Sequence, residues 1–119
     1  MSVSSARLVL VLAVLAIGAC KSADERAREA FLHDWLTSIE DDSPFFRQFV
    51  HDPRTVARIR SEVRPQLGAR QDVRSGESYN DGTRARTYEY GVTSTKKRFL
   101  VFLTEVDHRI VEANILGPE

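Results

Sequence analysis

A short apolar run near the start of the chain limits most strongly what the rest can be. Arg7 is followed by ten apolar residues, Leu8–Ile17, then by Gly18, Ala19 and Cys20. A basic residue, a short hydrophobic stretch and a small-residue processing site are the parts of an export signal. The run is too short for a transmembrane helix, which needs about 20 apolar residues. The sequence therefore predicts an exported chain.

The tetrapeptide Ile17-Gly18-Ala19-Cys20 resembles the lipobox of bacterial lipoproteins. The usual pattern is Leu, a small residue, Gly or Ala, and then Cys, so Ile17 is a mild departure. The resemblance implies cleavage between Ala19 and Cys20, loss of residues 1–19 as the signal peptide, and acylation of the Cys20 thiol and of the new amino terminus. An ordinary secretory signal with a chance cysteine is the alternative, but a lone exported cysteine then needs another explanation.

Charge and cysteine content narrow the classes of partner. The 17 Lys and Arg residues balance 17 Asp and Glu, which gives no basic excess of the kind that nucleic-acid binding uses, so no nucleic acid is expected. Cys20 is the only cysteine, so a lipidated chain has no thiol left for a disulfide or a metal site. We expect residues 20–22 to form the lipidated cysteine and a short tether, and residues 23–119 to form one small domain.

Helical periodicity marks the first half of this domain. Apolar residues recur every fourth position, at Ala27, Phe31, Trp35 and Ile39, and Ser22 with Glu25 fits a capping box. This pattern predicts an amphipathic helix over Ser22–Ile39.

One or two short helices are expected over residues 44–64. Each begins with a capping residue followed by proline, first at Ser43-Pro44 and again at Asp52-Pro53.

The period changes to two from Gln71 onward, which indicates strands. Asn80-Asp81-Gly82 is a tight-turn signal, and Phe99–Val106 is apolar on both faces, as a central strand is. The sequence predicts an α+β domain in which the helices pack on a four-stranded antiparallel meander sheet. The expected strands cover residues 73–79, which form an edge, and residues 87–92, 99–106 and 110–116.

The domain as a whole resembles small exported cystatin-like or NTF2-like domains. The resemblance rests on the Trp35-Leu36 helix, on residues 63–68 leading to Arg74, and on the hairpin strands at 87–90 and 99–106. It implies a sheet curled around the long helix.

The small lipoproteins of the outer-membrane β-barrel assembly machinery are a weaker resemblance. They also place two helices before an antiparallel sheet, but their Gly-Met-Thr helix start is replaced here by Asp52-Pro53-Arg54-Thr55.

Two groups of side chains are candidate sites. NTF2-like domains often bind a ligand in the concavity of the sheet, which Trp35, Tyr88 and Tyr90 would line, although regularly spaced aromatic residues usually form core. A basic surface over the short helices would meet anionic headgroups or an acidic partner, but such charge runs usually face water with partial pairing to acids. Its residues are Arg54, Arg58, Arg60 and Arg64.

No catalytic or metal motif appears in the sequence. Each histidine has an acidic neighbour, but residues adjacent in sequence do not face each other on a helix or strand. Three separated histidines make no recognisable metal-ligand spacing. We therefore expect no enzyme, no metal and no cofactor.

The expected function is that of a lipid-anchored, non-catalytic protein that binds another envelope protein or stabilises an envelope assembly. Lys21 follows the cysteine where enterobacterial lipoproteins retained in the inner membrane carry Asp, which favours the outer membrane, facing the periplasm. One alternative is an inhibitor or immunity protein against an envelope-targeting toxin or hydrolase, with an exposed loop over Gly91–Lys97. A small-molecule-binding NTF2-like domain is the other.

Overall fold

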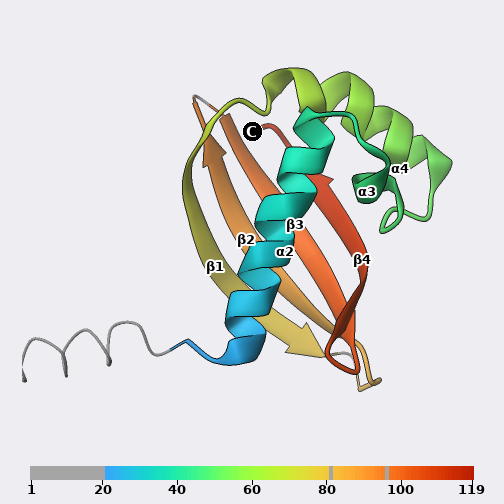
Figure 1. Ribbon diagram of the computed structural model, residues 1–119, viewed down its shortest axis with the longest axis vertical. Helices are drawn as coiled ribbons and strands as arrows, with labels where there is room; N and C mark the ends of the chain where they lie inside the picture. The colour runs from blue at the N-terminus through green and yellow to red at the C-terminus, as the bar shows by residue number, and fades with distance from the viewer. Residues whose placement is uncertain (1–20, 81, 96) are drawn as a thin grey trace, which may run out of the picture.

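The computed structural model describes residues 21–80, 82–95 and 97–119. The predicted signal peptide, the cleavage position after Ala19 and the lipidation site Cys20 lie outside these residues. A helical half precedes a four-stranded sheet, so the predicted α+β class is confirmed (Figure 1). The elements are α2 (Ala23–Glu40), α3 (Pro44–Arg47), α4 (Pro53–Arg58), η1 (Ile59–Val63), η2 (Arg64–Gln66), β1 (Arg70–Asn80), β2 (Arg86–Ser94), β3 (Lys97–Val106) and β4 (Arg109–Leu116).

Helix α2 begins where the capping signal places it. The Ser22 hydroxyl accepts a hydrogen bond from the Glu25 backbone N–H at 3.1 Å, which satisfies a free donor of the first turn. One expectation was wrong: Ala27 is exposed, and its neighbour Arg28 is buried instead. The start of the helix therefore packs a long charged side chain against the sheet. The apolar face begins one turn later, at Leu32, and continues to Ile39.

The two short helices predicted over residues 44–64 are confirmed. The Asp52 carboxylate caps α4 by accepting from the Arg54 backbone N–H at 2.9 Å, whereas Ser43 makes no such bond at the start of α3. Helix α4 continues into the π-helical turn η1 and the 3₁₀ turn η2, which contains Pro65. Proline has no backbone N–H to donate, and it is tolerated in η2 because it stands in the first turn of that segment.

The sheet is an antiparallel meander in the order β1-β2-β3-β4, as predicted. Strand β1 lies at an edge and β3 lies inside the sheet, which also agrees with the sequence. The expectation of an exposed loop over Gly91–Lys97 was wrong, because β2 continues to Ser94 and β3 begins at Lys97. Ser94 is fully buried, and its backbone pairs with Lys97, so the connection between these strands is very short.

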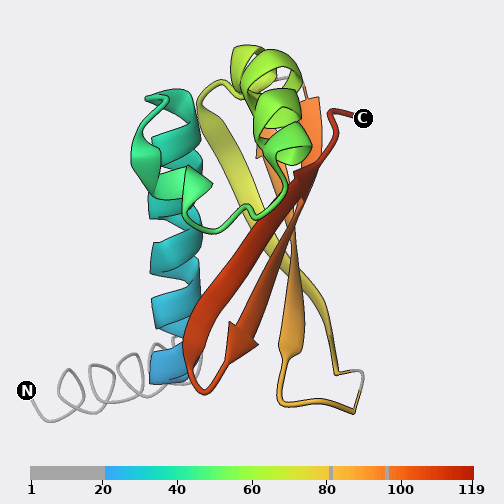
Figure 2. The ribbon, with the colours of Figure 1, turned by 90° about the vertical axis from the view of Figure 1, so that its right-hand side faces the viewer.

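Among the described residues, the helices lie on one side of the sheet and leave its other face without a helical cover (Figure 2). The core fills the space between the two layers. Trp35, Leu36 and Ile39 from α2 meet Val101 and Leu103 from β3 there, and all five are fully buried. In the part of the chain that the structure describes, no helix is both long and apolar enough to span a lipid bilayer.

Candidate functional site: the open face of the sheet

The side chains on the uncovered side of the sheet follow from strand alternation. Phe99, Val101 and Leu103 are buried toward the helices, so Leu100 and Phe102 between them point to the opposite side. The register carries this assignment to the neighbouring strands, because cross-strand partners share a face. We call this surface the open face. It comprises Asp72, Arg74, Tyr79, Thr87, Glu89, Gly91, Thr93, Arg98, Leu100, Phe102, Thr104, Glu112, Asn114 and Leu116.

An apolar strip runs across the middle of the open face. Leu100 pairs with Gly91 on one side and with Leu116 on the other, and Phe102 follows two residues later on β3. The Leu116 side chain is 46% exposed, and Leu100 and Phe102 are half-buried. Burying such side chains against a partner is favourable at about 25 cal/mol per Å² of apolar surface. Covering the strip with the apolar surface of a partner would therefore be favourable.

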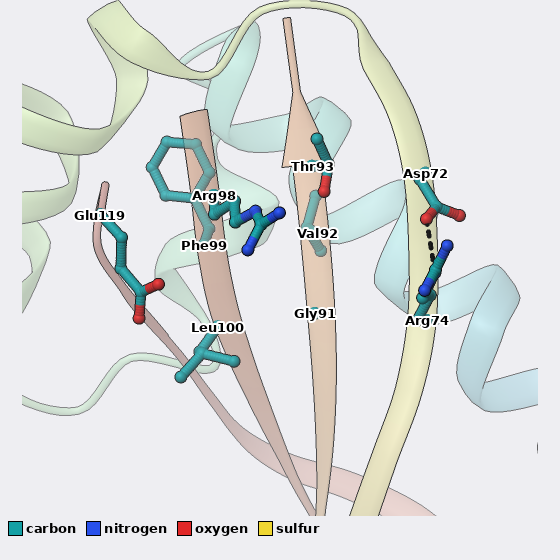
Figure 3. Close-up of a pocket in the computed structure, with 9 residues that line it drawn as sticks. All are labelled: Asp72, Arg74, Gly91, Val92, Thr93, Arg98, Phe99, Leu100 and Glu119. Carbon is teal, nitrogen blue, oxygen red and sulfur yellow. Dashed lines mark hydrogen bonds and ion pairs between the residues drawn. The ribbon is translucent and has the colours of Figure 1, made fainter. Parts of the chain in front are cut away.

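Gly91 opens a hollow beside this strip. The hollow has a volume of about 360 Å³ (Figure 3). A Cβ atom built on Gly91 would meet only the backbone oxygen of Arg74, at 4.0 Å. The fold therefore does not need a glycine here for lack of space, and the missing side chain is what leaves room on the surface. A glycine inside a strand often marks a place where a ligand or another backbone approaches closely.

Charged side chains border the hollow from two strands. On β1, Arg74 Nε donates to Asp72 Oδ2 at 2.7 Å, so these two charges are paired. On β3, Arg98 extends toward β2 (Figure 3), and its guanidinium has no ion-pair partner among residues 21–80, 82–95 and 97–119. The hollow is thus lined by both polar and apolar residues, Glu119 among them, and carries one unpaired cation, Arg98, at its rim.

The three aromatic residues expected to line a pocket are placed differently from one another. Trp35 is fully buried in the core, where its indole N–H donates to the Phe46 carbonyl at 3.1 Å. The Tyr88 ring lies under the Arg28 guanidinium, 3.8 Å from ring centroid to Cζ. Tyr90 is 4% exposed and lines a cavity of about 160 Å³ between α2 and β1. Trp35 and Tyr88 do not line that cavity, so the structure does not bring the three together.

A buried charged cluster was missed by sequence reasoning. Arg28 is 8% exposed and donates to the Glu105 carboxylate at 3.3 Å while it stacks on Tyr88. Burial lowers the pKa of Arg28, but its contacts with Tyr90 and Glu105 outweigh this effect and raise it. Burial in turn raises the pKa of the Tyr90 phenol. The signal in the sequence was Arg28 at helical spacing from Leu32 and Trp35, a position that a charge occupies only with partners.

The predicted basic surface is largely engaged with the rest of the domain. Arg60 donates to Asp42 at 2.9 Å, and Arg64 donates to the Glu40 carbonyl at 3.2 Å. Their hydrogen bonds fix the π-helical segment to the end of α2.

The other two arginines differ in exposure. Arg58 donates to the Asn114 side chain at 3.2 Å and to the Ile115 carbonyl, which attaches α4 to β4. Arg54 is 93% exposed and lies 3.5 Å from Asp52. Arg58, Arg60 and Arg64 thus act mainly as intramolecular hydrogen-bond partners, and Arg54 is the most solvent-exposed side chain of this basic surface.

Each histidine contacts a group other than its acidic neighbour in sequence. His33 Nδ1 lies 3.0 Å from Arg70, His51 Nε2 lies 3.1 Å from the Val111 carbonyl, and His108 Nδ1 lies 3.2 Å from Asp24. Across the described residues, no group of three or more His, Cys, Asp and Glu side chains is arranged to hold a metal ion.

Comparison with protein-family models, with curated proteins and with solved structures found no match to this chain.

Proposed function

We propose that this protein is a lipid-anchored component of the bacterial cell envelope that binds another envelope protein through the open face of its sheet. The observation that supports the binding surface is the one-sided arrangement of the fold. In the described part of the chain the helices lie on one face of the sheet (Figure 2). The other face carries the apolar strip of Leu100, Phe102 and Leu116 beside the Gly91 hollow, which Figure 3 shows. Apolar side chains gathered on an uncovered sheet face are a recurrent feature of protein interaction sites.

The anchor is proposed from the lipobox-like tetrapeptide that ends at Cys20. Helix α2 begins at Ala23, so three peptide units separate the cysteine from the folded domain. Such a segment spans at most about 10 Å. A lipid on Cys20 would therefore keep the domain at the membrane surface, and its partner would lie close to the same membrane. Lys21 favours the outer membrane, with the domain facing the periplasm.

The chemistry of the open face indicates what kind of surface the partner presents. An apolar patch would cover Leu100, Phe102 and Leu116, and a carboxylate next to it would pair with Arg98 at the rim of the hollow. Such a core of apolar contacts with a charged rim is the usual anatomy of a protein interface. No step of this proposal requires a catalytic group or a cofactor.

The anchor is tested by metabolic labelling with an alkyne analogue of palmitate in a bacterial host. The wild-type chain should take up the label, and Cys20→Ala should not. Cys20→Ser is a second control, because it keeps the size of the side chain but offers no thiol for the diacylglycerol. Equal labelling of the wild type and the two variants would reject the anchor.

The binding surface is tested by pull-down from detergent-solubilised membranes with matched variants. Leu116→Asp places a charge on the apolar strip, and Ala30→Asp places the same charge on an exposed position of α2. Proteins retained by the wild type and by Ala30→Asp, but lost with Leu116→Asp, would support the open face. Retention that is the same for both variants would contradict it, provided that circular dichroism shows both variants folded.

A further inference from the structure

The two edges of the sheet differ in whether their backbone groups are already bonded. On the β4 edge, the Ala113 N–H donates to the Phe49 carbonyl at 2.9 Å, and the His51 ring lies 3.1 Å from the Val111 carbonyl oxygen. Arg58 donates to the Ile115 carbonyl on the same edge. The segment before α4 and the helix itself thus close this edge, which removes it as a site for strand pairing.

The register identifies the backbone groups that β1 presents on its own edge. In an antiparallel sheet, successive residues direct their N–H and C=O groups to opposite edges. The Ala113 N–H points away from β3, so the even-numbered residues of β4 are the ones whose backbone groups bond to β3. Their partners on β3 are also even-numbered, which leaves the backbone groups of Val101 and Leu103 to bond to β2. Carried across the next two registers, this alternation makes Gly91 bond to Arg74, its partner on β1.

Val73 and Ser75 therefore direct their N–H and C=O groups outward from β1, which is the free edge strand of the sheet. In the part of the chain that the structure describes, no hydrogen bond satisfies these outward groups. The Val73 side chain is also 42% exposed, although it lies on the face that the helices cover. Strand β1 thus combines unpaired backbone groups with an uncovered apolar side chain, which is the condition for adding a strand.

The sequence around Val73 is complementary to itself in one antiparallel register. When two copies of Asp72-Val73-Arg74 run in opposite directions with Val73 opposite Val73, each Asp72 faces the other copy's Arg74. Asp72 and Arg74 share one face of the strand and form an ion pair within the chain at 2.7 Å. Their side chains are nevertheless 47% and 85% exposed, so each can exchange this partner for the opposite charge of a second copy. Opposite charges directly across a strand pair stabilise it.

The registers shifted by two residues in either direction are unfavourable. One shift places Asp72 opposite Asp72, and the other places Arg74 opposite Arg74, and like charges directly opposite are destabilising. A shift by one residue places the outward N–H and C=O groups of one copy opposite residues of the other copy whose groups point inward. Irregularities in the β1–β2 pairing between Arg70 and Asp72 and between Ser75 and Ser78 bound the regular stretch. The charges therefore select one register for a second copy of this chain.

We propose that two copies of this protein form a symmetric dimer by antiparallel pairing of their β1 edges, centred on Val73. The two four-stranded sheets then form one continuous sheet. The two-fold axis runs perpendicular to the sheet, so both α2 helices lie on one side and both open faces lie on the other. The dimer leaves the open face available in both copies, and its interface does not depend on what that face binds. The membrane setting of the tests below rests on the lipid anchor proposed above.

The first test is disulfide trapping of the full chain in membranes. Paired residues across a strand have Cα atoms about 5.5 Å apart, within the range that a disulfide bridges. With a thiol oxidant, Val73→Cys should give a covalent dimer on a non-reducing gel. Tyr79→Cys, on the same strand and 47% exposed, should stay monomeric because the proposed register gives it no opposing strand residue. The wild-type chain, whose only cysteine is Cys20, shows how much covalent dimer forms through that residue.

The second test uses exchanged charges, measured as the dimer dissociation constant of the detergent-solubilised full chain by analytical ultracentrifugation. Asp72→Arg and Arg74→Asp each replace two attractive contacts with repulsive ones, so each should weaken the homodimer by about tenfold. When the two variants are mixed, every cross-strand contact becomes attractive again. The mixture should form a heterodimer with an affinity close to that of the wild type, and each variant should keep the wild-type circular dichroism spectrum.

Several results would overturn the proposal. A Val73→Cys chain that gives no more dimer than Tyr79→Cys would exclude pairing centred on Val73. A mixture of the two charge variants that associates no better than either variant alone would exclude the register. A wild-type chain that remains monomeric at the concentrations reached in the membrane would exclude the dimer itself.

Discussion

Arg28 Nη1 lies 3.3 Å from Glu105 Oε2, and this contact joins the first turns of α2 to the far end of β3. The two side chains are only 9% and 14% exposed, and the guanidinium also covers the Tyr88 ring. Arg28 Nε has no hydrogen-bond partner within the described part of the chain. The pair therefore fixes where the helix crosses the sheet, while each charge depends on the other to offset its desolvation.

We expect Arg28→Ala to destabilise the domain by about 3 kcal/mol, because it leaves the Glu105 carboxylate under the helix without its cation. The double variant Arg28→Met with Glu105→Leu should recover most of this loss, since it removes both charges and keeps apolar packing. Urea unfolding followed by Trp35 fluorescence measures both. A double variant as unstable as Arg28→Ala would show that the packing of Arg28, and not its charge, carries the effect.

The Asp42–Arg60 contact predicts a dependence of stability on pH. The hydrogen bond from Arg60 holds the pKa of the Asp42 carboxyl below its ordinary value of 3.8. A carboxyl with a lowered folded-state pKa stabilises the protein above its unfolded value and loses that contribution as the pH falls through the folded value. Stability should therefore decline below about pH 4.

Two substitutions distinguish the contribution of the Asp42–Arg60 pair to this pH dependence from that of the other carboxylates. Arg60→Gln should make the decline in the free energy of unfolding less steep below pH 4, whereas Arg54→Gln should leave its slope as in the wild type. Chemical unfolding at a series of pH values makes the comparison. The prediction fails if Arg60→Gln and Arg54→Gln give the same slope.

Two glycines are expected to respond in opposite ways to alanine. Gly91→Ala adds a methyl group into the open hollow and restricts the unfolded chain, so it should stabilise the domain by about 0.5–1 kcal/mol. Gly117→Ala should destabilise it by more than that, because the residue has φ +115° and its Cβ would lie 2.8 Å from the Arg98 carbonyl oxygen. Thermal unfolding of the two variants checks the difference in sign. Destabilisation by Gly91→Ala would mean that the hollow is closed in solution.

The order of elements could be predicted from the sequence because its signals are local. Capping at Ser22 and Asp52 and the period-two pattern of β3 depend on residues close together in the chain, and the structure places helices and strands accordingly. The boundaries were less accurate at β1 and β2. Strand pairing across the sheet extends both beyond the residues that alternate.

The arrangement of the site could not be predicted in the same way. Ala27 is exposed and Arg28 is buried because α2 crosses the sheet with Arg28 over the Tyr88 ring. This contact joins residues far apart in the sequence. The loop expected at Gly91–Lys97 is strand because Thr93 and Ser94 pair with β3, and their polar character gave no sign of it. The open face likewise appears only when the helices are seen to lie on one side of the sheet.

The most direct test of binding through the open face is site-specific photo-crosslinking in living cells. A benzophenone side chain in place of Phe102 lies on the apolar strip, and the same group in place of Arg26 lies on the exposed side of α2. Irradiation should give a discrete adduct with another envelope protein at position 102 and none at position 26. The same adduct at both positions, or no adduct at position 102, would contradict the account.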